Sequence, residues 1–191
     1  MNYKQQLKLI CNDFISVNHY MNYRVAGKIV MAYKPKATKD FEKKFGKYVK
    51  EEIDKQGWIK PPKGKLVIVD TTFYFPRIDM DANNYFKCML DVATEVGVWE
   101  DDNITMERVN GLYYDAKNPR IEITLSVSDR VGIFNNDNDY EEFKSRCDNC
   151  TWFKEGKCGT YKKALESRIQ DEIVLVDDKW TCNKLKTKKT K

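Results

Sequence analysis

The sequence contains a single histidine, His19, and it lacks several motifs by which common enzyme classes are recognised. It has no Gly-x4-Gly-Lys-Ser/Thr, which argues against an ATP-driven motor, and neither Gly-x-Ser-x-Gly nor His-Glu-x-x-His. The His-x-Glu of the zinc nucleobase deaminases is absent as well. One histidine cannot supply the commonest zinc hydrolase sites, so the chemistry must rest on other side chains.

Long hydrophobic runs are also missing. No stretch approaches the ~18 apolar residues of a membrane span. The N-terminal MNYKQQLKLICNDF has neither the basic start and long apolar core nor the small-residue cleavage site of a signal peptide. We therefore expect a protein of the cytoplasm of a bacterial host cell, with no membrane partner. In that reducing compartment, the six cysteines are not expected to form three disulfides.

The composition indicates a folded and mildly basic protein. Hydrophobic residues make up 41% of the chain and aromatic residues 13%, which is enough to fill a core. Lysine and arginine exceed aspartate and glutamate by 34 to 29, although one segment is locally acidic. A basic protein with one acidic patch suits a polyanionic partner that is handled through bound cations. Many soluble proteins are mildly basic, however, so charge alone does not decide.

The spacing of apolar residues predicts an α+β fold, in which helices pack on a mixed β-sheet. The stretch KIVMAYK follows a turn at Ala26–Gly27, which predicts a hairpin. Residues 37–57 carry apolar side chains at three- and four-residue steps, which predicts a helix that Thr38 caps and Gly57 ends.

Further strands are expected downstream. Residues 65–76, KLVIVDTTFYFP, are dense in apolar and β-branched side chains, which favours a strand. Residues 111–128 indicate two strands around a turn at Asp115 to Pro119, and so a second hairpin. We expect a first domain over residues 1–130, a polar linker over 131–145, a cysteine-rich module over 146–183 and a basic tail over 184–191.

Acidic side chains are concentrated in RIDMDANNYFKCMLDVATEVGVWEDD, residues 77–102. If Asp79 and Asp81 end a strand, their spacing of two points both carboxylates to the same side. The stretch VWEDD brings Asp101 and Asp102 back into the chain as it enters the next element. These carboxylates converge if that return runs beside the end of the strand.

A helix over residues 84–96 would have two different faces. One face is apolar and would pack on the sheet, and the opposite face carries Asn84, Lys87 and Asp91. Gly97 can end this helix. Two or three converging carboxylates would bind a hard divalent cation, which is typical of Mg²⁺-dependent phosphodiester cleavage. The alternative is a solvated acidic turn beside a solvated helix face, and the spacing does not exclude it.

A resemblance supports the metal-site interpretation. The stretch DMDANNYFKCMLDVATEVGVWEDDNITMERV resembles the signature of the RusA family of Holliday junction endonucleases: Asp-x-Asp-Asn, a Lys three residues later, an apolar–Asp pair, Gly, an apolar–Trp pair and a double Asp. GLYYDAKNPRIEITL takes the place of the family's closing hairpin, and SVNHYMNYR and KATKDFEKKF are similar to its N-terminal segment and first helix. The positions that fit the signature are Asn84, Lys87, Asp91, Gly97, Trp99, Asp101 and Asp102.

The resemblance, which covers roughly residues 9–128, implies a homodimeric, Mg²⁺-dependent enzyme of phage or prophage type. Such an enzyme nicks branched DNA, the four-way junction, symmetrically on two strands during recombination and repair, and it needs no nucleotide cofactor. Asp79, Asp81 and Asp102 would then hold the metal and its water. Lys87 would contact the scissile phosphate or offset charge on the leaving oxygen.

Other residues gain roles from the same resemblance. Asp91 is a further metal ligand or only the ion-pair partner of Lys87, one helical turn away. Asn84 is a helix cap or an amide that orients a ligand. Arg77, beside the site, is a candidate phosphate contact. The residues implied to contact DNA are Asn18, Tyr20, Arg77, Asn84 and Lys87.

One departure from the family pattern concerns DMDANN, where two residues separate Asp81 from Asn84. Either the chain bulges there and Asp79 with Asp81 keeps the two acidic positions, or Asp81 and Asn83 take them and one carboxylate has become an amide. The first interpretation is favoured, because a third negative ligand offsets a divalent cation better.

The cysteine-rich module lies outside the region of resemblance. CDNCTWFKEGKC supplies Cys147, Cys150 and Cys158, and Cys182 can complete a set of four. In a reducing compartment this set favours a tetrahedral Zn²⁺ site, with an iron–sulfur cluster as the less favoured metal and unliganded thiols as the alternative to any metal.

Two functional hypotheses follow. The first is a structure-selective DNA endonuclease, and the second is a noncatalytic DNA-binding or regulatory protein that uses the cysteine module. The acidic segment favours the first, because a DNA-binding module gains nothing from negative charge beside DNA.

Overall fold

The structure is a computed structural model that describes residues 5–188, and the chain divides into two compact units. The first unit comprises the residues up to 61 together with 67–127, and the second comprises 62–66 together with those from 128 onward. None of the helices in the described part of the chain is long and apolar enough to cross a membrane.

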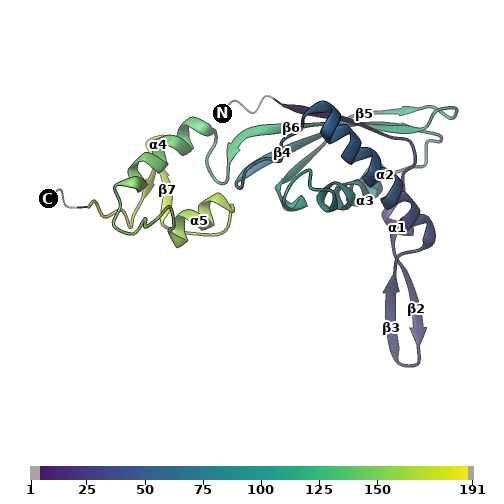
Figure 1. Ribbon diagram of the computed structural model, residues 1–191, viewed down its shortest axis with the longest axis horizontal. Coiled ribbons are helices and arrows are strands. Elements are labelled where there is room, and N and C mark those ends of the chain that lie inside the picture. The colour runs from purple at the N-terminus through teal and green to yellow at the C-terminus, as the bar shows by residue number, and fades with distance from the viewer. Residues whose placement is uncertain (1–4, 189–191) are drawn as a thin grey trace. The chain divides into compact units, whose positions relative to one another are not determined.

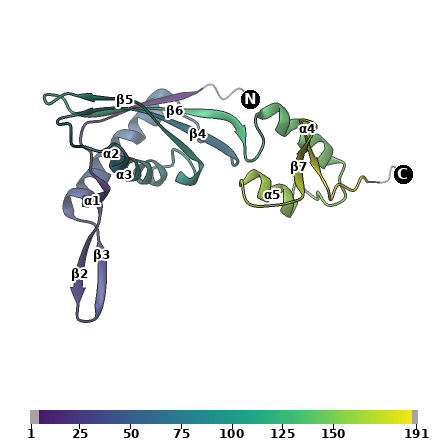
Figure 2. The ribbon, with the colours of Figure 1, turned by 180° about the vertical axis from the view of Figure 1, so that it is seen from behind.

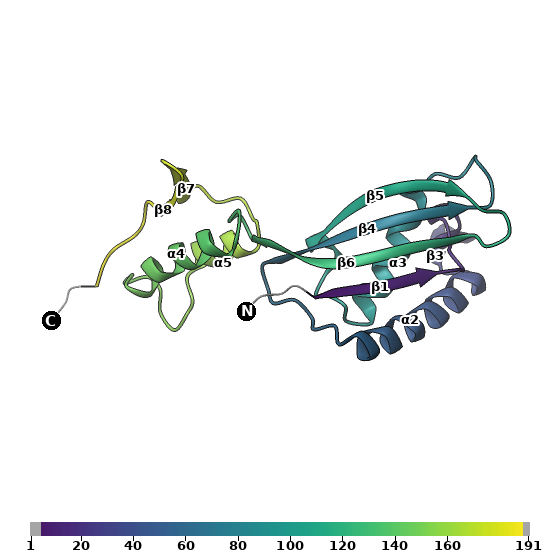
Figure 3. The ribbon, with the colours of Figure 1, turned by 90° about the horizontal axis from the view of Figure 1, so that it is seen from above.

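The first unit is built on a four-stranded sheet with the order β1-β6-β4-β5 (Figure 3). β1 (Gln6–Cys11) pairs antiparallel with β6 (Arg120–Val131), and β4 (Lys65–Phe75) pairs parallel with β5 (Thr105–Tyr114). The helix α3 (Asn83–Glu95) connects the two parallel strands. The sheet is therefore mixed, and the predicted α+β class is confirmed.

The second predicted hairpin, at residues 111–128, is wrong. Both strands exist, but β4 lies between β5 and β6 in the sheet. β4 buries every second side chain along its whole length, as a central strand does. Because β5 joins β4 through the α3 crossover, β6 can reach only the other edge of β4.

Two helices cover one face of this sheet, as Figure 1 shows. α2 (Lys36–Gln56) buries Phe41, Phe45 and Val49, and Gly57 ends it in the left-handed conformation (φ 67°), as expected. Thr38 does not cap α2. Pro35 occupies the cap position, while Thr38 is buried inside the helix and donates its hydroxyl to the backbone oxygen of Tyr20.

The apolar face predicted for α3 is also confirmed. Its buried members are Met89, Leu90 and Ala93, and Phe86 and Val96 pack against the same core. They lie over apolar side chains of the sheet, which include Leu7, Leu9, Val67, Val69, Phe73 and Phe75. This packing fixes α3 on the sheet and leaves its polar face outward.

The first predicted hairpin is confirmed, with α1 (Val17–Tyr20) preceding it. β2 (Asn22–Ala26) pairs antiparallel with β3 (Ile29–Tyr33) around Gly27, whose φ is +63°. Every residue of both strands is exposed. Figures 1 and 2 show this hairpin extending away from the sheet of its own unit.

The second unit contains α4 (Asp137–Asp148), α5 (Gly159–Leu165), β7 (Ile173–Val176) and β8 (Lys179–Cys182). Its buried side chains include Phe134, Phe143, Tyr161, Ala164 and Ile173. The segment 131–145, expected to be a polar linker, thus holds the fully buried Phe134 and most of α4, and is part of this unit. In the expected basic tail, Thr187 forms a β-bridge with Cys150, and residues 189–191 lie outside the described residues.

Candidate active site

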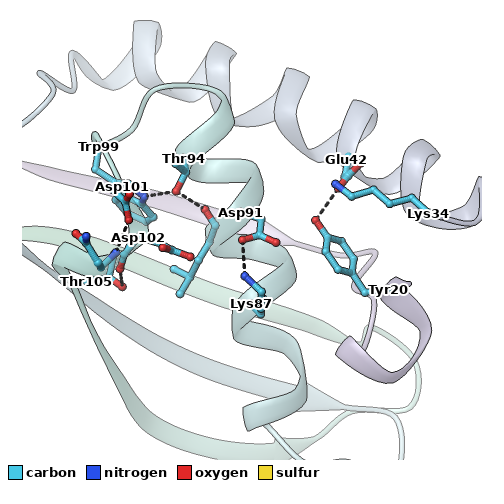
Figure 4. A network of polar contacts seen from close by, with 12 residues as sticks. Tyr20, Lys34, Glu42, Lys87, Asp91, Thr94, Trp99, Asp101, Asp102 and Thr105 are labelled. Carbon is cyan, nitrogen blue, oxygen red and sulfur yellow. Dashed lines mark hydrogen bonds and ion pairs between the residues drawn. The ribbon is translucent and has the colours of Figure 1, made fainter. Parts of the chain in front are cut away.

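Acidic side chains from α3 and from the short helix η1 (Asp102–Ile104) line one pocket of about 300 Å³ in the first unit. Tyr20 and Lys34 line the same pocket from the other side (Figure 4). We call it the acidic pocket, and its lining comprises Tyr20, Lys34, Asp91, Thr94, Glu95, Asp101 and Asp102.

Trp99 holds the turn that carries the two aspartates against α3. Its ring is buried, and its Nε1–H donates to Thr94 Oγ1 at 2.7 Å. The Thr94 hydroxyl donates in turn to the backbone oxygen of Leu90 at 2.9 Å. The tryptophan of the apolar–Trp pair therefore has a structural role, because its hydrogen bond holds the VWEDD segment against the helix that carries Asp91.

Asp101 and Asp102 form different hydrogen bonds. The Asp101 carboxylate accepts the backbone N–H of Asn103 at 3.0 Å and so caps η1. Asp102 is anchored through its backbone, because its carbonyl oxygen accepts the hydroxyl of Thr105 at 2.7 Å. Its carboxylate is thus available to the acidic pocket, and its charge contributes to the raised pKa of Lys87.

Lys87 and Asp91 form the expected ion pair, with 2.9 Å between Lys87 Nζ and Asp91 Oδ1. The hydrogen bond to Asp91 raises the pKa of Lys87, burial opposes this, and the charges of Asp91 and Asp102 add to the rise. Lys87 therefore stays protonated at neutral pH. Asp91 is partly buried and also lines the acidic pocket, so it lies within reach of a ligand there.

Sequence reasoning missed Glu42. It lies on α2, and its carboxylate accepts a hydrogen bond of 2.6 Å from the Tyr20 hydroxyl and an ion pair from Lys34. Asp91, on α3, lies near the same phenol, because both residues line the acidic pocket. Burial, followed by these acidic neighbours, raises the pKa of Tyr20. No spacing in the sequence relates Glu42 to Asp91, because only the packing of α2 and α1 beside α3 brings them together.

Asp79 and Asp81 are not on a strand. β4 ends at Phe75, since Pro76 has no backbone N–H with which to continue the ladder, and both aspartates follow in an irregular loop. Asp79 is exposed and pairs with Nε of Arg77 at 2.9 Å. Asp81 accepts the backbone N–H of Asn83 at 3.0 Å and so helps α3 to begin. Neither residue lines the acidic pocket.

Asn84 is the second residue of α3, so the helix-cap role is wrong. Ala82 occupies the cap position, and the backbone N–H of Asn84 donates to the carbonyl oxygen of Asp81 at 3.1 Å. Asn84 does share a helix face with Lys87, three residues on. Asn83 and Asp91 are separated by roughly 12 Å along α3, at about 1.5 Å per residue. The loop carboxylates and the acidic pocket therefore lie at different levels of one helix.

The acidic residues are consequently found in two groups rather than one. Within residues 5–188, no set of three or more His, Cys, Asp or Glu side chains is arranged to hold a metal ion. The donors of the acidic pocket are carboxylate oxygens, which are the ligands that Mg²⁺ prefers, so the chemistry of the set fits a hard cation.

The two remaining DNA-contact candidates differ in exposure. Asn18 is exposed on α1. Tyr20 is only 5% exposed and donates to Glu42, so it belongs to the polar network of the pocket and not to an open DNA-binding surface.

Four cysteines of the second unit line one pocket of about 250 Å³. We call it the four-cysteine pocket, after Cys147, Cys150, Cys158 and Cys182. Burial raises the pKa of the Cys147 thiol to about 12, and the charges of the other three cysteines contribute to the rise. Cys11 and Cys88 are buried in the other unit, away from this pocket.

Comparison with known proteins gives one family. Residues 15–126 match the family described as "Endodeoxyribonuclease RusA", which is more than half of the 191 residues. None of the curated proteins compared with the chain matches it significantly. The matched region contains α1 to α3, the acidic pocket and the loop with Asp79 and Asp81, and it stops before residue 128, where the larger part of the second unit begins. The chain therefore belongs to the RusA endodeoxyribonuclease family and is a nuclease of the Holliday junction resolvase type, not a noncatalytic DNA-binding protein.

Proposed function

We propose that the protein nicks four-way DNA junctions in a Mg²⁺-dependent reaction, symmetrically and as a homodimer, during recombination and repair. The observation that carries this proposal is the acidic pocket, where Asp91 and Asp102 lie beside a protonated Lys87. Symmetric cleavage of two strands requires two such pockets, and the proposed homodimer contains one in each copy. A second copy supplies the other.

Asp102 and Asp91 are the residues of the pocket that would hold the cation. Asp81 lies outside the pocket, in the loop before α3, and is proposed as a further ligand. A bound Mg²⁺ polarises the phosphate and lowers the pKa of the attacking water. Lys87 carries the complementary role, because its ammonium group can contact the scissile phosphate and offset charge on the leaving oxygen. Its ion pair with Asp91 keeps the side chain extended along the pocket face of α3 until DNA arrives.

Asp79 is the fourth carboxylate of the proposed set, and its ion pair with Arg77 determines whether it is free to bind the cation. In the absence of DNA the two side chains pair with each other on an exposed loop. A phosphate that engages the Arg77 guanidinium competes with the Asp79 carboxylate for the same donors. DNA binding would thus release Asp79 next to Asp81. The alternative, that Asn83 takes this position, predicts that Asp79→Asn leaves cleavage unchanged.

The remaining DNA contacts are proposed for two polar side chains, of which Asn18 is exposed and Asn84 is partly exposed. Asn18 on α1 and Asn84 on α3 can reach phosphate or sugar oxygens, in addition to Arg77 and Lys87. These contacts position the junction and carry no sequence information.

The test is cleavage of labelled four-way junctions by the purified protein in Mg²⁺. We expect the wild type to nick the junction, and an Asp81→Asn, Asp102→Asn double variant to bind it without cutting. Glu100→Gln is the matched control, because Glu100 is an exposed acid of the same turn that does not line the acidic pocket. Equal cutting by the double variant and the control would overturn the assignment.

A further inference from the structure

The four-cysteine pocket gathers sulfurs from four separate parts of the second unit. Cys147 lies in the last turn of α4, and Cys150 follows this helix by two residues. Cys158 directly precedes α5, and Cys182 ends β8. Over thirty residues separate the first from the last, so their convergence on one pocket is a property of the fold and not of local spacing.

Backbone turns present two of these sulfurs in the same way. The N–H of Cys150 donates to the oxygen of Cys147 at 2.8 Å, and that of Phe153 donates to the oxygen of Cys150 at 3.2 Å. After Cys182, the N–H of Leu185 donates to its oxygen at 3.0 Å. Each turn leaves the following backbone N–H groups directed toward the cysteine side chain.

Burial acts to raise the pKa of the Cys150 and Cys182 thiols, and nearby backbone N–H groups act to lower it. These groups belong to Trp152, Phe153 and Lys186 at Cys150, whose pKa is lowered overall, and to Lys184 at Cys182. Backbone donors of this kind stabilise a thiolate, which is the form that binds metals. A cysteine that serves only as a small apolar core residue has no use for three donors. Cys11 shows the contrast, because its thiol is itself a donor, to the backbone oxygen of Asp13.

The two halves of the pocket are also joined by backbone pairing. Thr151 donates its N–H to the oxygen of Lys186 at 2.8 Å, and Lys188 donates to the oxygen of Asn149 at 2.9 Å. The turn that carries Cys150 and the segment that follows Cys182 are therefore held side by side. The thiols are not arranged as a finished metal site anywhere in the part of the chain that the structure describes. All four thiols nevertheless line the same pocket.

A cross-link at this position has a clear structural purpose. The core of the second unit consists of a small cluster of buried side chains, and Cys147 is one of them. Units of this size often need a metal or disulfides in addition to their core. A metal bound by all four sulfurs would tie α4, the start of α5 and β8 together at one point.

We propose that the four-cysteine pocket binds one structural Zn²⁺ through its four sulfurs. Four soft sulfur ligands in a closed tetrahedral set select Zn²⁺ among the common divalent ions, and no open position remains for substrate. Four Zn–S bonds form at about 2.3 Å each, and the thiol protons are released to solvent. This site is independent of the proposed Mg²⁺ chemistry, so it is tested by metal content and not by cleavage.

The experiment uses the full-length protein, purified without chelators, and measures metals by mass spectrometry. We expect one zinc per chain in the wild type and near zero in a Cys150→Ser, Cys182→Ser double variant. A Cys11→Ser, Cys88→Ser double variant is the matched control and should keep its zinc. Refolding the chain with Co²⁺ should produce the absorption of tetrahedral thiolate coordination. Iron with acid-labile sulfide, zinc loss in the control, or no zinc in the wild type would each overturn the proposal.

A second measurement covers the case in which the double variant fails to fold. Native wild-type protein is alkylated with iodoacetamide before and after zinc is extracted, and modified cysteines are mapped by mass spectrometry. Cys158 and Cys182 are only partly buried, so without a metal they should react at once. We expect both to be protected until extraction. Immediate modification of these two thiols, without zinc release, would contradict the proposal.

Discussion

At the scale of single residues, a phenol in the acidic pocket lies near two carboxylates. Tyr20 donates to Glu42, which also pairs with Lys34, and Asp91 lies near the same phenol. Asp91 in turn pairs with Lys87. Polar side chains therefore extend from α2 to the face of α3 that we propose contacts the scissile phosphate, and we infer that Glu42 is a positioning residue at the far end of this network.

Glu42→Gln tests this role. Glutamine keeps the shape but removes the charge that holds Lys34 and Tyr20, so Asp91 and Lys87 lose part of their support. We expect the single-turnover rate of junction cleavage to fall roughly tenfold, about 1.4 kcal/mol, which is of the order of one charged hydrogen bond. Junction affinity should change little, because the Glu42 side chain is largely shielded from solvent.

The matched control for this prediction is Glu51→Gln on the same helix. Glu51 is exposed and forms an ion pair with Lys47, one turn away at 3.8 Å. Removing this exposed pair should leave both rate and affinity unchanged. A Glu42 variant that cleaves as fast as the Glu51 variant would show that the network does not support the site.

At the scale of elements, the sequence predicted what local patterns determine. The β2–β3 hairpin follows from its Gly27 turn, the end of α2 from Gly57, and the two faces of α3 from helical spacing. The pairing of β5 and β6 could not be predicted in this way, because no local signal says that β4 is inserted between them. The cap at Thr38 failed because the tertiary hydrogen bond to the oxygen of Tyr20 outweighed its local preference.

In the candidate site too, contacts within one helix could be predicted from the sequence, and contacts between elements could not. The ion pair of Lys87 and Asp91 was predictable, because residues four apart on a helix are neighbours. The position of Asp102 beside Asp91 depends on the Trp99 anchor, which pattern alone does not reveal. Glu42 could not be predicted, since only packing between helices brings it to Tyr20, which lines the pocket.

Gly132 supports a further prediction about the second unit. Its φ is +53°, and a Cβ atom there would lie 2.2 Å from the backbone oxygen of Ala164, at the end of α5. Backbone cannot give way as a flexible side chain can, so Gly132→Ala should destabilise this unit by roughly 2–4 kcal/mol. Hydrogen-exchange mass spectrometry would detect the change as faster exchange in α4 and α5.

Gly156→Ala is the control that distinguishes the steric clash expected at residue 132 from the cost of a left-handed backbone. Gly156 also has a left-handed φ, +74°, but nothing lies within 4 Å of the added Cβ. It should therefore cost about 1 kcal/mol from strain alone. If the two alanine variants exchange at the same rate, the close approach of α5 is not what requires glycine at 132.

At the scale of the whole molecule, positive charge is available next to the acidic pocket. A row of lysines follows one face of α2, and it borders a surface hollow that shares Glu95 with the acidic pocket. The members of this row are Lys39, Lys43, Lys47 and Lys50. A net charge of +5 attracts DNA to the protein but does not orient it. A row of lysines beside the site can also position the arms of a junction, because each lysine can neutralise a phosphate at a fixed place.

The lysine row leads to a prediction about salt dependence. In a Lys43→Gln, Lys50→Gln variant, the slope of log affinity against log salt should decrease by roughly 1.8, about 0.9 for each duplex phosphate that a lysine no longer neutralises. The cleavage rate at saturating junction should stay unchanged, because neither lysine lines the acidic pocket. A Lys8→Gln, Lys117→Gln variant removes the same charge from exposed positions on β1 and in the β5–β6 turn. If the control variant lowers the slope equally, net charge and not the lysine row governs DNA binding.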